Sequence, residues 1–325
     1  MNRNLAPVPP LDPAADARHR TIQRFDRHIR ATRTGGQKTA VIYLYAVNNL
    51  AAWMTEHGRA AFTDLDADDL DDFFAAHRDG TPPFTRPHAE KTIEQQYKSL
   101  RVFFKWVADR PATDKDWVDP MERAVPRTAG NDDIVNKVLT DEQLRAVLAT
   151  VTGRRDFQSV RDLALLQVLL SGVRRGELAA LTVADVDLDT DRIWVKGKGD
   201  SHGTRGRWVV LGPKTMAAVD DYLELRERHK LSYLPNLWLG RNGPVTGRGI
   251  HSIVSDRGEQ AGIPGLHPHM FRHTHAHRWL MAGGNETDLM ENEGWSSPAM
   301  LKIYAKTTRA ERAQAAARKL RLDEI

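Results

Sequence analysis

Four side chains in the last third of the chain have the chemistry needed to act on a phosphodiester. His269 and Arg272 stand three residues apart, and Tyr304 follows Trp295 after nine residues. Arg272 supplies a permanent planar cation that suits phosphate oxygens, and His269 can exchange a proton near neutral pH. Trp295 offers an indole N–H donor, and the Tyr304 hydroxyl is a potential nucleophile. The segment therefore predicts a site that could hold a phosphate beside an attacking phenol.

Two simpler interpretations compete with this one. His269, His273 and His277 recur at every fourth position, so they could line one helix face as metal ligands. We favour no metal site, because the acidic residue of the zinc-protease helix motif is missing and the chain contains no cysteine. Trp295 and Tyr304 could be ordinary core aromatics, which taken singly is their commoner role. An active-site interpretation therefore needs support from residues upstream.

A second arginine stands in the middle of the chain, just beyond a segment that should be buried. The residues after Val160 are apolar almost all round a helix, which predicts a buried helix ending near Gly172. Arg174 comes two residues later and Glu177 three residues after that, where the carboxylate could orient the guanidinium. A purely structural ion pair is the alternative role for these two side chains.

The periodicity then changes to that of β-strands. Three short runs, at 186–189, 192–195 and 207–211, predict a small three-stranded antiparallel sheet. Lys198 lies in the glycine-rich turn between the second and third runs, where it could reach into DNA. A plain surface turn is the alternative, and the phosphate-binding pattern G-x-x-x-x-G-K-[ST] is absent.

The first third of the chain predicts a small all-helical domain. Thr39 and Asp66 can cap two helices, and Gly80 can end the second. Apolar residues at helical spacing over 93–107 predict a third helix. Its other face carries a polar stripe whose charges are all positive, which either faces solvent or contacts DNA: Lys91, Gln95, Lys98, Arg101 and Lys105.

The composition indicates a two-domain protein without membrane segments. The chain has 325 residues, of which 41% are hydrophobic, and contains no cysteine. It lacks a long apolar run and a signal-peptide pattern, and the absence of cysteine fits a cytoplasmic location. The net charge of +4 is compatible with nucleic acid binding but does not require it.

Pro- and Asp-rich stretches divide the chain. Helical periodicity begins near Thr21, and Thr140 and Gln143 form a capping box where regular structure restarts. The predicted divisions are a flexible tail at 1–19, a helical domain at 20–112, a linker at 113–137 and a second domain with a C-terminal helix at 138–325.

Together these motifs resemble those of the tyrosine recombinase, or phage integrase, family. The matching segments, in order, are S-G-V-R-R-G-E-L, V-K-G-K-G-D, H-P-H-M-F-R-H-T and E-G-W, followed after nine residues by tyrosine. The resemblance implies that the catalytic residues are Arg174, Lys198, His269, Arg272, Trp295 and Tyr304, with Glu177 in support. It also implies a mainly helical fold, in which a helical core-binding domain precedes a mostly helical α+β catalytic domain with the small sheet.

Two positions depart from the family pattern or align less securely. Glu293 precedes Gly294 and Trp295, where the family usually has leucine, and this change could alter local packing. The turn around Lys198 is somewhat long, so Lys196 is the alternative hairpin lysine.

The resemblance implies a site-specific recombinase that cleaves and rejoins DNA through a 3′-phosphotyrosyl intermediate, without metal, ATP or another cofactor. Its partners would be double-stranded DNA attachment sites, bound by a homotetramer that is monomeric when free in solution. We favour an integrase of a phage or mobile element. The alternatives are a Xer-type resolvase, a type IB topoisomerase-like enzyme, a non-enzymatic DNA-binding regulator and a zinc protein.

Overall fold

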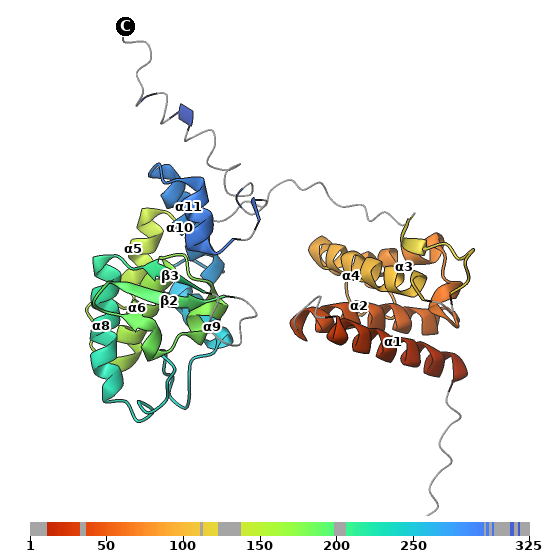
Figure 1. Cartoon of the computed structure of the whole chain (residues 1–325), viewed down its shortest axis with the longest axis horizontal. Helices are drawn as coiled ribbons and strands as arrows, with labels where there is room; N and C mark the ends of the chain where they lie inside the picture. The colour runs from red at the N-terminus through yellow and green to blue at the C-terminus, as the bar shows by residue number, and fades with distance from the viewer. Residues whose placement is uncertain are drawn as a thin grey trace, which may run out of the picture. The chain divides into compact units, whose positions relative to one another are not determined.

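A computed structural model gives the fold of the chain in two compact units (Figure 1). The described residues are 12–32, 37–110, 113–122, 138–197 and 206–295, with Ser297, Pro298, Leu301, Ala313, Gln314 and Arg318. The first unit comprises residues 1–133 and the second 134–325, so the boundary falls within the predicted linker. Lys198 and Tyr304 lie outside the described residues.

The first unit is built from helices alone among its described residues. They are α1 (Pro13–Ala31), α2 (Gln37–Glu56), α3 (Ala67–Asp79) and α4 (Glu90–Ala108), with short 3-10 helices η1 (Phe62–Asp64) and η2 (Pro120–Glu122). Asp66 caps α3 as predicted, because its carboxylate accepts the Asp69 N–H at 2.9 Å. Gly80 ends the helix at a φ of 70°. Aromatic rings of Phe25, Phe62 and Phe103 meet edge to face in the core.

The first helix starts earlier than the sequence predicted. Asp12 accepts the Ala14 N–H, and Pro13 occupies the first turn, where its missing N–H costs nothing. Arg18 is buried and donates to the Arg59 carbonyl at 2.5 Å. Residues 12–19 are therefore part of the folded unit, and the predicted tail was too long.

Two further boundaries differ from the prediction. Helix α2 begins at Gln37, so Thr39 lies inside it and does not cap it. Part of the predicted linker belongs to the first unit, because Met121 is buried in its core. Trp117 also packs there, and its indole N–H donates to the Thr63 carbonyl at 3.0 Å.

The second unit is mostly helical with one small sheet. Its helices are α5 (Asp141–Ala149), α6 (Phe157–Leu169), α7 (Arg175–Ala180), η3 (Val183–Asp185), α8 (Pro213–Glu227), α9 (Gly247–Gln260), α10 (Pro268–Met281) and α11 (Glu286–Glu293). Thr140 and Gln143 form the predicted capping box, with Gln143 N–H donating to Thr140 Oγ1 at 3.2 Å.

The predicted three-stranded antiparallel sheet is confirmed. Its strands β1 (Val186–Asp187), β2 (Arg192–Lys196) and β3 (Gly206–Val210) lie in that order. Trp194 and Trp208 face each other across β2 and β3, with ring centroids 5.2 Å apart. The mainly helical fold class predicted from the sequence is also confirmed.

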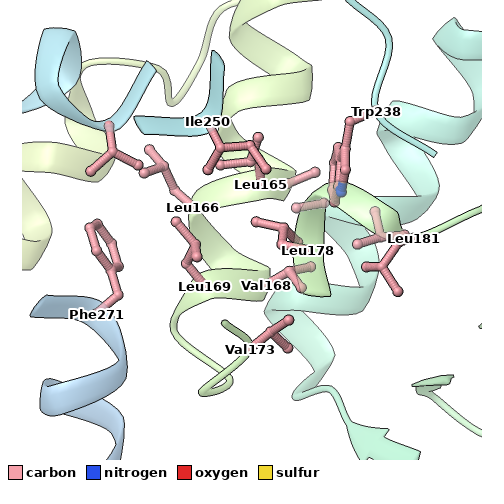
Figure 2. Packing of buried hydrophobic residues seen from close by; sticks show 14 of the residues in the cluster. Leu165, Leu166, Val168, Leu169, Val173, Leu178, Leu181, Trp238, Ile250 and Phe271 are labelled. Carbon is pink, nitrogen blue, oxygen red and sulfur yellow. The ribbon is translucent and has the colours of Figure 1, made fainter. Parts of the chain in front are cut away.

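The core of the second unit surrounds α6. Figure 2 shows Leu165, Leu166 and Leu169 of this helix in one cluster with Ile250 of α9 and Phe271 of α10. Each such buried side chain stabilises the fold by about 1.5–3 kcal/mol. The prediction of a buried helix after Val160 is confirmed, although Asp156 caps it and it begins earlier, at Phe157. This core fixes the ends of α6, α7 and α10, which carry the candidate site.

Over the described part of the chain, no helix has both the length and the apolar character needed to cross a bilayer.

Candidate active site

Arg174 and Glu177 form the pair that the sequence predicted. Arg174 occupies the N-cap position of α7, and Glu177 lies one turn into that helix. Arg174 Nη1 donates to Glu177 Oε1 at 2.6 Å, while Glu177 Oε2 accepts the Arg174 backbone N–H at 3.0 Å. Both charge-assisted bonds fix the direction of the guanidinium. The Arg174 side chain is 35% exposed, so a ligand could reach it.

Arg272 is held more tightly. It lies on α10 and is 2% exposed. Its Nη1 donates to the Gly172 carbonyl at 2.5 Å, and its Nη2 donates to the Glu293 carbonyl at 2.5 Å. Burial lowers the pKa of Arg272, and the carboxylate of Glu293 acts in the opposite direction. The guanidinium is therefore a buried and oriented cation.

The C-terminal end of α11 gathers three arginines from three other parts of the second unit. Consecutive carbonyl oxygens at 292–294 accept from Arg207 Nε at 2.6 Å, Arg272 Nη2 at 2.5 Å and Arg174 Nη2 at 2.9 Å. Carbonyls at a helix C-terminus have no partner within the helix and carry partial negative charge, so they favour cations. Arg174 and Arg272, far apart in sequence, are thereby brought together.

Two glycines allow this approach. Gly172 has a φ of 84°, and a Cβ there would lie 2.4 Å from Glu293 Oε1. Gly294 has a φ of 61°, and a Cβ there would lie 2.9 Å from Arg207 Nη1 and 3.4 Å from Arg174 Nη1. Both positions need the left-handed backbone that glycine adopts readily. The glycine of E-G-W therefore makes room for two guanidinium groups.

Arg207 is a site residue that the sequence analysis missed. It lies on β3 and donates from Nη2 to Glu177 Oε2 at 3.0 Å and from Nη1 to Oε1 at 3.3 Å. Burial raises the pKa of Glu177, but hydrogen bonds and charge from Arg207, with hydrogen bonds from Arg174, outweigh it and lower the pKa overall. The only signal in the sequence was an arginine at the end of the hairpin turn.

His269 lies in the first turn of α10 with an exposed side chain. Partial burial of its ring, followed by the charges of Arg272, His267 and Arg174, lowers its pKa. A lowered pKa favours the neutral imidazole at pH 7, which can accept a proton. The ring of His273 stacks at 5.7 Å from that of His269. Among the described residues, no three His, Cys, Asp or Glu side chains are placed to hold a metal ion.

Trp295 lies next to Arg272, as a member of a small cluster of buried residues. It packs with Ala276, Leu280 and Leu289 and is itself buried. The Arg272 guanidinium carbon lies 5.7 Å from the Trp295 ring centroid, within cation–π range. Trp295 is thus both a core aromatic and a neighbour of the buried cation, so the two interpretations of this residue are compatible.

The structure describes one of the two candidate hairpin lysines. Lys196 Nζ forms an ion pair with Asp185 Oδ2 at 3.2 Å. Lys198 and Tyr304 lie outside the described residues.

The basic residues predicted to contact DNA from the first unit are all exposed on α4: Lys91, Lys98, Arg101 and Lys105. The face is not purely positive, because Glu94 forms an ion pair with Lys98. A surface ion pair of this kind contributes at most about 1 kcal/mol and leaves the lysine able to exchange partners. Exposure is compatible with a role in DNA binding.

The arrangement suits an anionic transition state at phosphorus. Arg174 and Arg272 can donate to non-bridging oxygens, while neutral His269 and Trp295 can supply a proton acceptor and an indole donor. Preorganised donors of this kind need little rearrangement during the reaction.

Comparison with known proteins identifies the family of the chain. The sequence profile of the phage integrase family matches residues 137–311, more than half of the chain. The profile of the phage integrase N-terminal SAM-like domain matches residues 22–114.

Alignments with individual relatives also cover most of the chain. Tyrosine recombinase XerC of Roseiflexus sp. (strain RS-1) is 25% identical over 311 residues, covering 94% of each protein. XerC of Bacillus subtilis (strain 168) is 24% identical, covering 89% of this chain and 92% of that protein.

Two solved structures share the fold. The Tn1549 transposon integrase in complex with transposon right end DNA aligns with a TM-score of 0.70 at 19% identity, over 92% of this chain and 99% of that one. XerH site-specific recombinase bound to a palindromic difH substrate aligns with a TM-score of 0.69 at 16% identity, over 98% and 99%. The chain therefore belongs to the phage integrase, or tyrosine recombinase, family, as the order and spacing of its motifs predicted.

Proposed function

We propose that the protein is a site-specific DNA recombinase in which Tyr304 attacks a DNA phosphodiester. The observation that carries this proposal is the meeting of Arg174 and Arg272 at adjacent carbonyls of Gly294 and Glu293. These carbonyls lie about ten residues before Tyr304 in the sequence. The proposed phosphate clamp therefore comes shortly before the segment that carries the phenol in the sequence.

The two arginines stabilise the charge that develops on the non-bridging oxygens. Loss of one preorganised donor typically costs about 3 kcal/mol, or 10²–10³-fold in rate. Two guanidinium groups supply the charge neutralisation for which other phosphoryl-transfer enzymes use a metal ion. The proposed reaction therefore needs neither metal nor another cofactor.

Proton transfer is assigned to the remaining polar residues. The tyrosine hydroxyl has an unperturbed pKa of about 10, so it needs an acceptor or nearby cations at pH 7. His269 is the proposed acceptor, because its lowered pKa favours the neutral ring. Lys198 is the proposed donor to the departing 5′ oxygen. The ion pair of Lys196 with Asp185 favours Lys198 over Lys196 in this role.

The phosphotyrosyl ester formed by Tyr304 replaces one phosphoester with another. The free 5′-hydroxyl of a second strand can then attack it, so rejoining needs no ATP. Exchange between two duplexes requires four such sites, so the proposed assembly on double-stranded attachment sites is a homotetramer. The proposed state in free solution is a monomer. The proposed location is with the nucleoid in the cytoplasm.

Integration and Xer-type resolution remain the two candidate outcomes. The relatives include XerC proteins, and the structural neighbours include a transposon integrase. Plasmids that carry two sites in one molecule, or one site each in two molecules, distinguish excision from integration. Relaxation of supercoils without a specific site would instead favour the topoisomerase alternative.

The decisive experiment uses a nicked suicide DNA with the attachment site, incubated with the full chain in EDTA. Wild type should form a covalent protein–DNA adduct, because the cleaved strand loses the short fragment that would reseal it. Tyr304→Phe should bind the DNA with unchanged affinity and form no adduct, because phenylalanine lacks the nucleophilic oxygen. An adduct that persists in Tyr304→Phe would refute the assigned nucleophile.

A further inference from the structure

Glu293 is a fully buried carboxylate in the middle of the site. It is the last residue of α11, and its side chain has 0% exposure. Its Oε2 lies 2.6 Å from Arg272 Nη2, an ion pair by distance that lacks hydrogen-bond geometry, and its Oε1 lies 2.6 Å from His275 Nδ1. His275 and Arg272 stand three residues apart on α10. One carboxylate therefore joins two positions of α10 to the end of α11.

A buried carboxylate is costly, and it must have partners that compensate for the lost water. Glu293 has them on both sides, and a third part of the unit is shaped around it. A Cβ at Gly172 would lie 2.4 Å from Glu293 Oε1 and 2.7 Å from His275 Nδ1. The loop after α6 thus leaves room for the carboxylate and the imidazole together.

The Arg272 guanidinium is fixed from two directions. Nη1 donates to the Gly172 carbonyl, and Nη2 meets both the carbonyl and the carboxylate of Glu293. A planar group held at two nitrogens has a fixed plane, so the direction of its other N–H groups is set. The leucine expected at position 293 from the resemblance could fill the space but could not hold the guanidinium.

We propose that Glu293 is a positioning residue that aims Arg272 at the scissile phosphate, and that His275 fixes Glu293 in turn. The inference rests on the proposed function, because it concerns the same phosphate. Glu293 does not touch the substrate in this proposal. Glu293 acts on the cleavage rate through Arg272. The size of this effect therefore depends on how much negative charge Arg272 must neutralise at the phosphate.

The test compares two suicide DNAs that differ only at the scissile phosphate. One is the ordinary phosphodiester, and the other carries a methylphosphonate, in which a methyl group replaces a charged non-bridging oxygen. Glu293→Leu should cleave the phosphodiester about 10²-fold more slowly in single turnover, since misplacement of a catalytic group by about 1 Å has that effect. On the methylphosphonate the slowing should shrink to about threefold, because less charge needs neutralising.

Controls separate positioning from a folding defect. Glu291→Gln, on an exposed side chain of the same helix, should leave both rates unchanged. If Glu293→Leu does not fold, Glu293→Gln keeps the shape, and its smaller slowing should show the same dependence on the substrate. Thermal melting and DNA affinity measured on each variant establish that the compared proteins are folded and bind the site.

His275→Ala supplies an independent check of the relay. It should slow cleavage less than Glu293→Leu does, and the double variant should be no slower than Glu293→Leu alone, because both changes act through one arginine.

The outcomes are distinguishable. Equal slowing of Glu293→Leu on both DNAs, or no slowing on the phosphodiester, would overturn the positioning role while wild-type adduct formation at Tyr304 upholds the recombinase. Absence of an adduct with wild type would instead overturn the proposed function and the inference with it.

Discussion

Arg174 and Arg272 differ in how firmly they are held. Arg272 is buried between Gly172 and Glu293, whereas the Arg174 side chain is 35% exposed and its partner Glu177 is shared with Arg207. A buried guanidinium with fixed partners cannot be replaced by a flexible ammonium without loss of geometry. At a partly exposed position such as that of Arg174, a lysine that replaces the arginine can still approach the same ligand.

The two arginines should therefore respond differently to the same substitution. We expect Arg272→Lys to reduce single-turnover cleavage by about 10³-fold, at the upper end of the loss of one preorganised donor. Arg174→Lys should lose about tenfold, because an exposed ammonium can still supply the charge. Rates of suicide-substrate cleavage at saturating protein measure both. A larger loss in Arg174→Lys than in Arg272→Lys would contradict the proposed difference.

Among the elements, α3 carries a buried histidine, His77, that should make stability depend on pH. This fully buried ring stacks on Phe84 with centroids 3.7 Å apart and lies against His88. Burial, and then the charge of His88, lowers the pKa of His77 to about 4 from an ordinary value of 6.5. In the unfolded chain the ring takes up a proton near pH 6.5, whereas in the folded unit it stays neutral. Acid between these values therefore favours unfolding.

His77→Phe should weaken this pH dependence. Phenylalanine can occupy the buried aromatic site and does not titrate. Wild type should lose about 2 kcal/mol of stability from this residue as the pH falls from 7.5 to 5, and the variant should lose correspondingly less. Chemical denaturation of both proteins at pH 7.5 and pH 5 measures the difference. An equal loss of stability in the two proteins would show that His77 is not the titrating group.

At the scale of the whole molecule, the proposed reaction requires assembly on DNA. The segment after Thr308 is a strong helix former with little apolar surface, and its described residues Ala313, Gln314 and Arg318 are exposed. We propose that this segment docks on a neighbouring protomer. It lies beyond every residue assigned to catalysis.

Deletion of residues 309–325 should therefore separate cleavage from assembly. The truncated protein should still bind a single site and form the suicide adduct within a few-fold of wild type, because Tyr304 is retained. It should form few complexes that join two DNA sites, as measured by native gel electrophoresis and analytical ultracentrifugation. Normal joining of two sites by the truncated protein would exclude docking through this segment.

The sequence by itself determined the local elements and the identity of the chemical groups. Asp66 and the pair Thr140–Gln143 indicate where helices begin, because a capping residue and its hydrogen-bond partner lie within three residues of each other. The alternating runs at 186–211 predicted the sheet, because strand periodicity is also a pattern among residues close in sequence. The motifs also identified Arg174 and Arg272, but they did not show that the two side chains lie close together in the fold.

Only the tertiary structure decided which charges meet. Arg207 pairs with Glu177, and Glu293 pairs with Arg272 and His275, although no local pattern links these positions. Capping and periodicity depend on neighbours a few residues away, so one sequence encodes them directly. The pairing of buried charges depends on how α7, α10, α11 and β3 pack around a common core, and that is a property of the folded unit.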